Sequence, residues 1–158
     1  MLTIVPATAG DIADIHRLIV ALAEYERLSE AVVSTEADIH TALFGVRPYA
    51  EVLLAKSGGD TVGFALFFHN FSTFLGRPGL YLEDLFVLPE RRGQGIGRSL
   101  LAALARVAVD RGCGRFEWSV LDWNEPAIGF YQRMGAQVMD EWRICRVTGE
   151  ALARLAEG

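Results

Sequence analysis

The stretch "LYLEDLFVLPERRGQGIGRSLLAALARVAVDRG", residues 80–112, decides the fold of this chain. It begins as an apolar, β-rich run that Pro89 ends, and after three glycines at alternate positions it takes up a helical period of about 3.6 residues. One face of that helical pattern carries Leu100, Leu101, Leu104 and Val107. The stretch therefore predicts a strand, a glycine loop and a helix from about Gly95 to Arg111.

Upstream of this stretch, the sequence predicts one strand, two helices and a hairpin. "LTIV" reads as a strand, and a helix starts near Thr8 and runs to about Leu28, followed by a second helix across Thr35–Phe44. Two β-rich runs then flank Gly58-Gly59-Asp60, which is a strong signal for an antiparallel hairpin.

Downstream, we expect a strand in "RFEWSVL", a helix over residues 124–134, strands in "AQVM" and "WRICRV", and a short closing helix. The strand–helix–strand connection from Leu80 to Leu121 requires a parallel pair, whereas the hairpin requires antiparallel pairs. The sequence therefore predicts an α/β protein of the α+β type with a mixed sheet, and not an all-parallel doubly wound sheet.

The composition is that of one folded domain, residues 1–158, with 51% hydrophobic and 22% charged residues. The formal net charge of -5 excludes a global basic field, so we expect neither nucleic acid nor an anionic membrane as partner, and a cationic molecule instead. The longest apolar runs fall short of the ~20 residues of a membrane span, and no signal-peptide pattern opens the chain. A cytoplasmic location is therefore expected.

Cysteine and histidine residues give no sign of a metal or disulfide site. The two cysteines, Cys113 and Cys145, are too few for a disulfide framework or a thiolate zinc site. The three histidines have no metal-ligand spacing: His16, His40 and His69. We expect no metal ion.

The glycine loop has the features of a phosphate site. The first N–H groups of a helix have no partners within it, and Gly93, Gly95 and Gly97 let a ligand approach the backbone closely. Arg91, Arg92 and Arg98 add positive charge nearby. The loop predicts a diphosphate ligand, and the alternative is a tight turn beside solvated charges.

The spacing of the glycines narrows the choice of diphosphate. No Gly-Lys-Ser/Thr follows, which excludes a Walker loop, and G-x-G-x-G differs from the dinucleotide G-x-G-x-x-G. Asp122, at the end of the next strand, keeps nicotinamide binding as a minor alternative, but the antiparallel hairpin upstream argues against a dinucleotide fold.

"RRGQGIG", read from Arg92, matches the R/Q-x-x-G-x-G/A signature of the GNAT acetyltransferases, and the chain resembles that superfamily. "YLEDLFVLPERRGQGIG", "VLDWNEPAIGFYQRMGA" and "LAEYERLSEAV" are similar to its diamine acetyltransferase group. Within that group, "LSE", "GQGIG" and "VLDWN" resemble the branch that acetylates thialysine, a lysine-like amino acid, more than the polyamine branch. The resemblance implies a mixed, mostly antiparallel sheet, splayed at its centre with helices on both faces. It also implies acetyl-CoA as cofactor and a homodimer.

The resemblance further implies which residues bind the cofactor. These are Leu85, Phe86 and Val87 on the strand, Arg92, Gly93, Gln94, Gly95, Ile96, Gly97 and Arg98 in the loop, and Asn124, Glu125, Pro126, Ala127 and Tyr131 further on. Asn124 is also a good helix N-cap, which is its alternative role. Since Asn124 and Tyr131 are seven residues apart, they lie on one face of the predicted helix.

Acetylation of an amine requires proton transfers, because a free alkyl amine of pKa about 10.4 is protonated at pH 7. Glu83 and Asp84 are neighbours on a predicted strand, so we expect their side chains to point to opposite faces. The resemblance favours Glu83 for relaying the amine's proton through a water, and Tyr131 as the general acid for the departing thiolate. The alternative for both carboxylates is a salt bridge or solvent exposure, and for Tyr131 a place in the core.

For substrate binding the resemblance implies Tyr25, Glu26 and Glu141, together with Glu83 and Asp84. Two features depart from the polyamine members: residues 70–79 lack their Asp and Trp, and no glycine separates Glu141 from Trp142. We expect an N-acetyltransferase for a small cationic amine, either thialysine- or lysine-like or a di- or polyamine, with direct transfer in a ternary complex. Acetylation of protein lysines or N-termini, and a non-catalytic acetyl-CoA sensor, are the alternatives.

Overall fold

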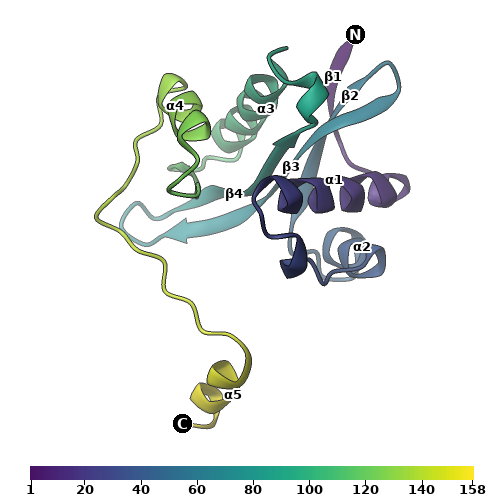
Figure 1. Ribbon diagram of the computed structural model, residues 1–158. Coiled ribbons are helices and arrows are strands. Elements are labelled where there is room, and N and C mark those ends of the chain that lie inside the picture. Colours follow the sequence, from purple (N-terminus) through teal and green to yellow (C-terminus); the bar gives the residue numbers. More distant parts are fainter. The chain divides into compact units, whose positions relative to one another are not determined.

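The computed structural model describes all 158 residues and divides the chain into two compact units, Met1–Ser119 and Val120–Gly158. The first unit holds the sheet and the first three α-helices, and the second holds the last two α-helices (Figure 1). No helix in the chain combines the length and the apolar character that a bilayer crossing requires.

The first unit is built on one sheet of five strands in the order β1-β2-β3-β4-β5. The strands are β1 (Leu2–Pro6), β2 (Glu51–Ser57), β3 (Asp60–Ser72), β4 (Arg77–Val87) and β5 (Phe116–Trp118). Neighbours from β1 to β4 are antiparallel, and β4 pairs with β5 in parallel. The prediction of a mixed sheet with a hairpin and one parallel pair is confirmed.

The sheet opens between β4 and β5. These two strands pair only from Leu80 opposite Phe116 to Leu82 opposite Trp118. β4 then continues to Val87 with β3 as its only neighbour. The edge of β4 from Glu83 to Val87 is therefore open, which is the splay that the family resemblance implied.

Helices cover both faces of the sheet: α1 (Ile12–Tyr25) and α2 (Glu36–Phe44) on one, and α3 (Ile96–Asp110) on the other (Figure 1). Their predicted ranges agree to within a few residues, and α1 ends at Tyr25 rather than near Leu28. Short 3-10 helices lie at three turns: η1 (Ala9–Asp11), η2 (Ser29–Ala31) and η3 (Pro89–Arg91).

Two apolar layers hold these helices in place. The layer under α1 and α2 contains Ile12, Ile15, Leu18, Leu43, Val52, Leu54, Phe64 and Phe86. On the other face α3 buries Leu100 and Leu104 completely, and Leu100 passes close to Gly63 of β3. Burial of one leucine contributes roughly 1.5–3 kcal/mol, so the two layers fix the strand ends that carry the site.

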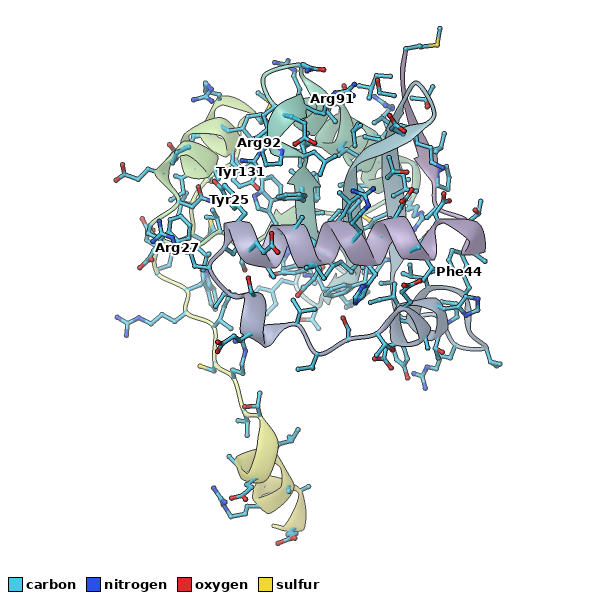
Figure 2. The ribbon with its side chains drawn as sticks, turned by 45° about the vertical axis from the view of Figure 1, so that its right-hand side comes forward. Tyr25, Arg27, Phe44, Arg91, Arg92 and Tyr131 are labelled. Carbon is cyan, nitrogen blue, oxygen red and sulfur yellow. The ribbon has the colours of Figure 1, made fainter.

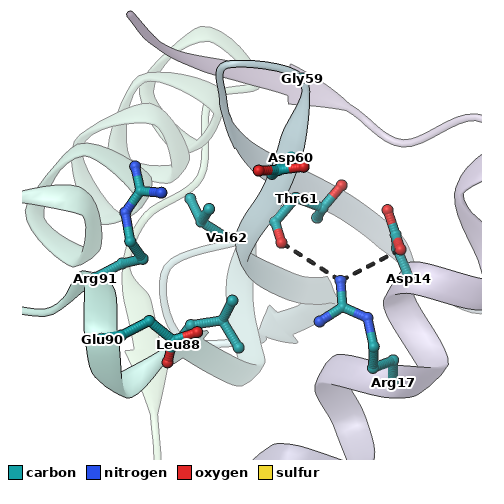
Figure 3. Close-up of a pocket in the computed structure, with 9 residues that line it drawn as sticks. All are labelled: Asp14, Arg17, Gly59, Asp60, Thr61, Val62, Leu88, Glu90 and Arg91. Atoms are coloured by element: carbon teal, nitrogen blue, oxygen red, sulfur yellow. Dashed lines mark hydrogen bonds and ion pairs between the residues drawn. The ribbon is translucent and has the colours of Figure 1, made fainter.

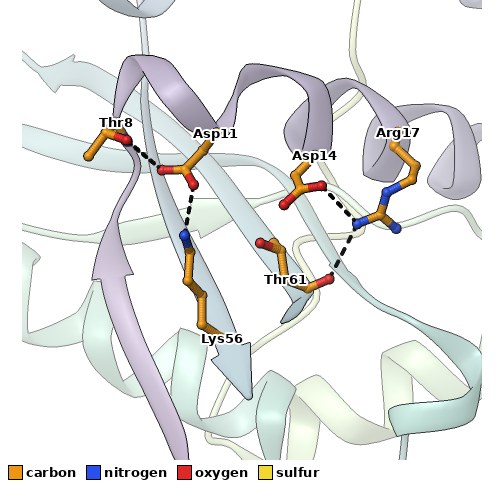
Figure 4. Close-up of polar contacts among 6 residues, drawn as sticks. All are labelled: Thr8, Asp11, Asp14, Arg17, Lys56 and Thr61. Atoms are coloured by element: carbon orange, nitrogen blue, oxygen red, sulfur yellow. Dashed lines mark hydrogen bonds and ion pairs between the residues drawn. The ribbon is translucent and has the colours of Figure 1, made fainter. Parts of the chain in front are cut away.

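Polar contacts anchor the beginning of α1 to the hairpin of β2 and β3 (Figure 4). The Asp11 carboxylate accepts hydrogen bonds from the backbone N–H and hydroxyl of Thr8, and it accepts a third from the Lys56 ammonium at 2.7 Å. One turn later, Arg17 donates to Asp14 and, more weakly, to the Thr61 carbonyl oxygen. The Asp11–Lys56 ion pair is the more buried of the two pairs.

The second unit contains α4 (Glu125–Arg133) and α5 (Gly149–Glu157). The helix predicted over residues 124–134 is confirmed, but the strands predicted in residues 136–139 and 142–147 are wrong, because these stretches form no strand. Their alternating apolar pattern is that of a strand, yet a strand forms only where a neighbour supplies hydrogen bonds. The second unit contains no other strand to do so.

Candidate active site

The glycine loop has an open backbone at the start of α3. Gly93 and Gly95 both have a φ of 77°, a conformation that side chains rarely adopt, and Gly95 occupies the N-cap position of the helix. A Cβ added to either glycine would meet no atom within 4 Å. Ile96 is buried and fixes the first turn, while Gln94 and Arg98 are exposed. The loop thus presents bare backbone to the surface.

This arrangement fits a diphosphate. The N–H groups of Ile96, Gly97 and Arg98 belong to the first turn of α3 and have no partners within the helix. They lie at the positive end of the helix dipole, where anions are favoured. The structure therefore supports the prediction that this loop can hold the diphosphate of a cofactor such as acetyl-CoA.

The three arginines near the loop have different environments. Arg92 folds back over the end of β4: its Nε donates to the Val87 carbonyl oxygen at 3.1 Å, and its guanidinium lies 4.6 Å from the centre of the Tyr25 ring (Figure 2). Arg91 donates to the Ser57 hydroxyl at 2.7 Å. Arg98 is exposed and makes no such contact. We therefore expect Arg98, rather than all three arginines, to add a free positive charge for an anion.

A β-bulge lies at Glu83, the predicted catalytic carboxylate, and Asp84, a predicted substrate residue. In the ladder between β3 and β4, Leu66 lies opposite Asp84 but Phe67 lies opposite Leu82, so Glu83 is an extra residue on β4. A bulge interrupts the alternation of side chains and redirects them. The expectation that Glu83 and Asp84 point to opposite faces assumed a regular strand, which β4 is not at this position, so it stays a prediction.

Three carboxylates influence one another at this position. Burial, followed by the charges of Glu83 and Glu26, raises the pKa of Asp84 to about 6. Burial also raises the pKa of Glu26, at the end of α1. Glu83 is exposed. Glu26, Glu83 and Asp84, which we call the acidic cluster, thus bring together three of the predicted substrate residues.

The bulge also decides which backbone groups face the open edge of β4. The N–H of Leu88 donates to Val62 of β3, and alternate residues of a strand point to the same edge. The N–H groups of Leu85 and Val87 therefore point away from β3, toward the open edge, while that of Phe86 points toward β3. Of the three predicted backbone donors, Leu85 and Val87 are the available ones.

The end of α1 fixes Glu26 of the acidic cluster and the adjacent Tyr25. The N–H of Leu28 donates to the Ala23 carbonyl and the N–H of Arg27 to that of Glu24, so the helix ends in a Schellman motif. Arg27 occupies the left-handed position of this motif with a φ of 62°, where glycine is usual. Sequence inspection missed this feature, because arginine gives no signal for a helix end of that kind.

In the second unit, the beginning of α4 has the predicted cap. The Asn124 side chain accepts from the Ala127 N–H at 3.4 Å, and Pro126 lies in the first turn. Asn124 is buried, and Tyr131 lies two turns along the same helix. Glu141 is exposed in a stretch without regular structure. Because these residues belong to the second unit, their meeting with the acidic cluster stays a prediction.

Comparison with known proteins gives the family. A model described as "Acetyltransferase (GNAT) family" matches residues 13–136. The chain belongs to the GNAT acetyltransferase family. It is 40% identical to a thialysine N-epsilon-acetyltransferase of Sus scrofa, over 95% of this chain and 94% of the relative. It is 37% identical to an L-ornithine N5-acetyltransferase of Arabidopsis thaliana, over 92% and 84% of the two chains.

A solved structure has the same GNAT fold. An integron cassette protein from the mobile metagenome of V. cholerae superposes with a TM-score of 0.84 at 27% identity, covering 99% of this chain and 98% of that one. The predicted fold and the predicted group of acetyltransferases are thus confirmed, and the protein is an N-acetyltransferase.

This GNAT protein also has a separate polar cavity of about 300 Å³, beside η3 and the β2–β3 turn (Figure 3). It is lined by Asp14, Arg17, Gly59, Asp60, Thr61, Val62, Leu88, Glu90 and Arg91. It contains none of the predicted catalytic or substrate residues, and arginines partly balance its carboxylates. The acidic cluster, and not this cavity, is therefore the candidate amine site.

Proposed function

We propose that this GNAT protein transfers the acetyl group of acetyl-CoA to a primary amine of a small cationic molecule, by direct transfer in a ternary complex. The observation that carries the proposal is the acidic cluster beside the open edge of β4, where the strand leads into the glycine loop. Carboxylates in that position attract a protonated amine.

The class of amine follows from the relatives. Two of them are named for acetylation of thialysine at its ε-nitrogen and of L-ornithine at N5. Both substrates are amino acids with a side-chain amine. We therefore propose that the preferred substrate of this protein is a basic amino acid, acetylated on its side-chain amine, and that di- and polyamines are the second candidates.

The residues present fit acetyl-CoA as the acetyl donor. The open backbone from Gly93 to Arg98 would hold its diphosphate, and the N–H groups of Leu85 and Val87 would donate to its carbonyl oxygen. Acetyl-CoA supplies an activated acetyl group. Asn124 and its neighbours at the start of α4 complete the set of cofactor residues in this proposal.

In this proposal, two carboxylates take up the proton of the amine, and the phenol of Tyr131 supplies the proton of the departing thiolate. The amine must lose a proton before it reacts, at a free-energy cost of roughly 4 to 5 kcal/mol at pH 7. Glu83 relays this proton through a water, and Asp84, with its pKa near 6, is suited to accept it. Tyr131 donates a proton to the departing thiolate.

A thiol-release assay with acetyl-CoA tests the function. The amine panel contains thialysine, L-ornithine, lysine, putrescine, spermidine and a lysine peptide. We expect turnover with the basic amino acids, and a KM for the amine that rises about tenfold or more in Glu26→Gln. Glu90→Gln, an exposed carboxylate outside the acidic cluster, is the matched control and leaves KM unchanged. Turnover of the peptide alone would favour a protein acetyltransferase, and cofactor binding without any turnover would favour a sensor.

We also propose that residues 1–158 act as one catalytic domain and assemble as a homodimer. The family match runs across the boundary between the two units, which supports a single domain. Several large apolar side chains of the second unit are exposed, including Trp142, Ile144 and Leu155. Exposed apolar surface of this kind is typical of association. Sedimentation equilibrium of the full chain tests the dimer.

A further inference from the structure

The guanidinium of Arg92 joins three parts of the first unit. It lies 4.6 Å from the centre of the Tyr25 ring, at the last residue of α1, and 5.4 Å from that of Phe86 on β4. Its Nε donates to the Val87 carbonyl oxygen. Arg92 is also the residue directly before Gly93, so its backbone belongs to the glycine loop.

These contacts are strong enough to matter for binding. An arginine over an aromatic ring is attracted to the negative face of the ring, the attraction grows as the pair is desolvated, and the hydrogen bond to Val87 adds to it. Tyr25 is 38% exposed, so the contact is partly shielded from water. Together these interactions correspond to roughly a tenfold change in an equilibrium constant.

Arg92 and Tyr25 belong to parts of the proposed site that bind different ligands. Tyr25 and Glu26 are on the amine side of the proposed site, and Arg92 is on the cofactor side. The loop that follows Arg92 is bare glycine backbone that a bound diphosphate would hold in one conformation. Arg92 is thus the one residue that connects the backbone of the loop to the end of α1 through its side chain.

We propose that the contact between Arg92 and Tyr25 couples cofactor binding to amine binding, with both residues acting as positioning residues. Occupation of the glycine loop holds Arg92, Arg92 holds the Tyr25 ring, and the end of α1 with Glu26 is ordered for the amine. The effect on amine binding rests on the proposed function, whereas the ordering of the end of α1 by the cofactor does not. Because linkage is reciprocal, the amine strengthens cofactor binding by the same factor.

Hydrogen exchange with CoA alone tests the coupling without any amine. The amides of Arg27 and Leu28 close the end of α1 through bonds to Glu24 and Ala23, so their exchange reports its order. In the wild type, saturating CoA is expected to slow this exchange about fivefold or more. Arg92→Gln and Tyr25→Leu abolish the effect, whereas Tyr25→Phe, which keeps the ring, retains it. Arg98→Gln is the matched control, because it removes a loop charge that does not contact Tyr25.

Calorimetry of amine binding in the presence and absence of CoA gives the second readout, since CoA cannot donate an acetyl group. The amine is expected to bind about five- to tenfold more tightly with CoA in the wild type and in Tyr25→Phe, and equally in Arg92→Gln and Tyr25→Leu. If no amine binds but CoA protects the end of α1 through Arg92, the proposed function fails and the coupling stands. Unchanged exchange in the wild type, or full protection in Arg92→Gln, overturns the coupling.

Discussion

Asp84 and Leu66 lie directly opposite each other in the ladder of β3 and β4, on the face of the sheet that α1 covers. The Asp84 carboxyl group is largely buried there, and this burial, together with the charges of Glu83 and Glu26, raises its pKa to about 6. Above that pH its ionised form destabilises the fold.

Asp84→Asn is accordingly expected to stabilise the protein at high pH. The raised pKa means that the stability contributed by the protonated form is present below pH 4 and lost as the pH rises through 6. Urea unfolding should show a gain of the order of 1–2 kcal/mol for the variant at pH 8, and none at pH 3.5. The same variant should lose roughly 10²-fold in kcat. A gain that is equal at both pH values would contradict the buried, titrating carboxyl.

Tyr131→Phe tests the general acid. Loss of the phenol proton should reduce kcat by about 10² or more, because the departing thiolate is then protonated only by solvent. Affinity for CoA should stay within about twofold, measured by calorimetry. Phe130→Leu, a change at the neighbouring ring, is the control for packing within α4. Undiminished turnover in Tyr131→Phe would remove this residue from the mechanism.

Lys56→Met tests the anchor of α1. The Lys56 ammonium is the first cause of the lowered pKa of Asp11, so this pair stabilises the fold fully above the ordinary pKa of an aspartate and loses its effect as the pH falls through the lowered pKa. The substitution should cost about 1 kcal/mol at pH 7, and its cost should decrease as the pH is lowered, by urea unfolding.

Arg17→Met is the matched control for this pair. Its partner Asp14 is 3.3 Å away, and both side chains are about half exposed, so the loss should stay below about 0.5 kcal/mol. Equal losses for the two variants would mean that burial of the Asp11–Lys56 pair has no effect.

The order of elements could be predicted because each carries its own local signal. Thr35 begins α2, where its hydroxyl accepts from the Asp38 N–H as the capping pattern predicts. The turn at Gly58 and Gly59 and the crossover through α3 fix which strands are antiparallel and which are parallel. None of these features depends on contacts that are distant in sequence.

The bulge at Glu83 could not be predicted in this way. β4 is covered by helices on both faces, so its apolar residues do not alternate with polar ones, and a change of phase leaves no mark in the pattern. The strands predicted after residue 135 do not form for a related reason. A strand needs a neighbouring strand to pair with, and the local sequence pattern does not show whether one is present. The contact between Arg92 and Tyr25 likewise joins residues that only the fold brings together.

Gly95→Ala tests the glycine loop as the diphosphate site. At a φ of 77° an alanine is strained by about 1 kcal/mol, and its methyl group would project into open space where nothing lies within 4 Å. Gly58→Ala is the matched control, because Gly58 also has a positive φ and open surroundings but lies in the β2–β3 turn. Both variants should lose similar stability in thermal unfolding. Only Gly95→Ala should weaken CoA binding, by about tenfold or more, because its methyl group blocks the approach of the phosphates to the backbone; equal CoA affinity in the two variants would place the diphosphate elsewhere.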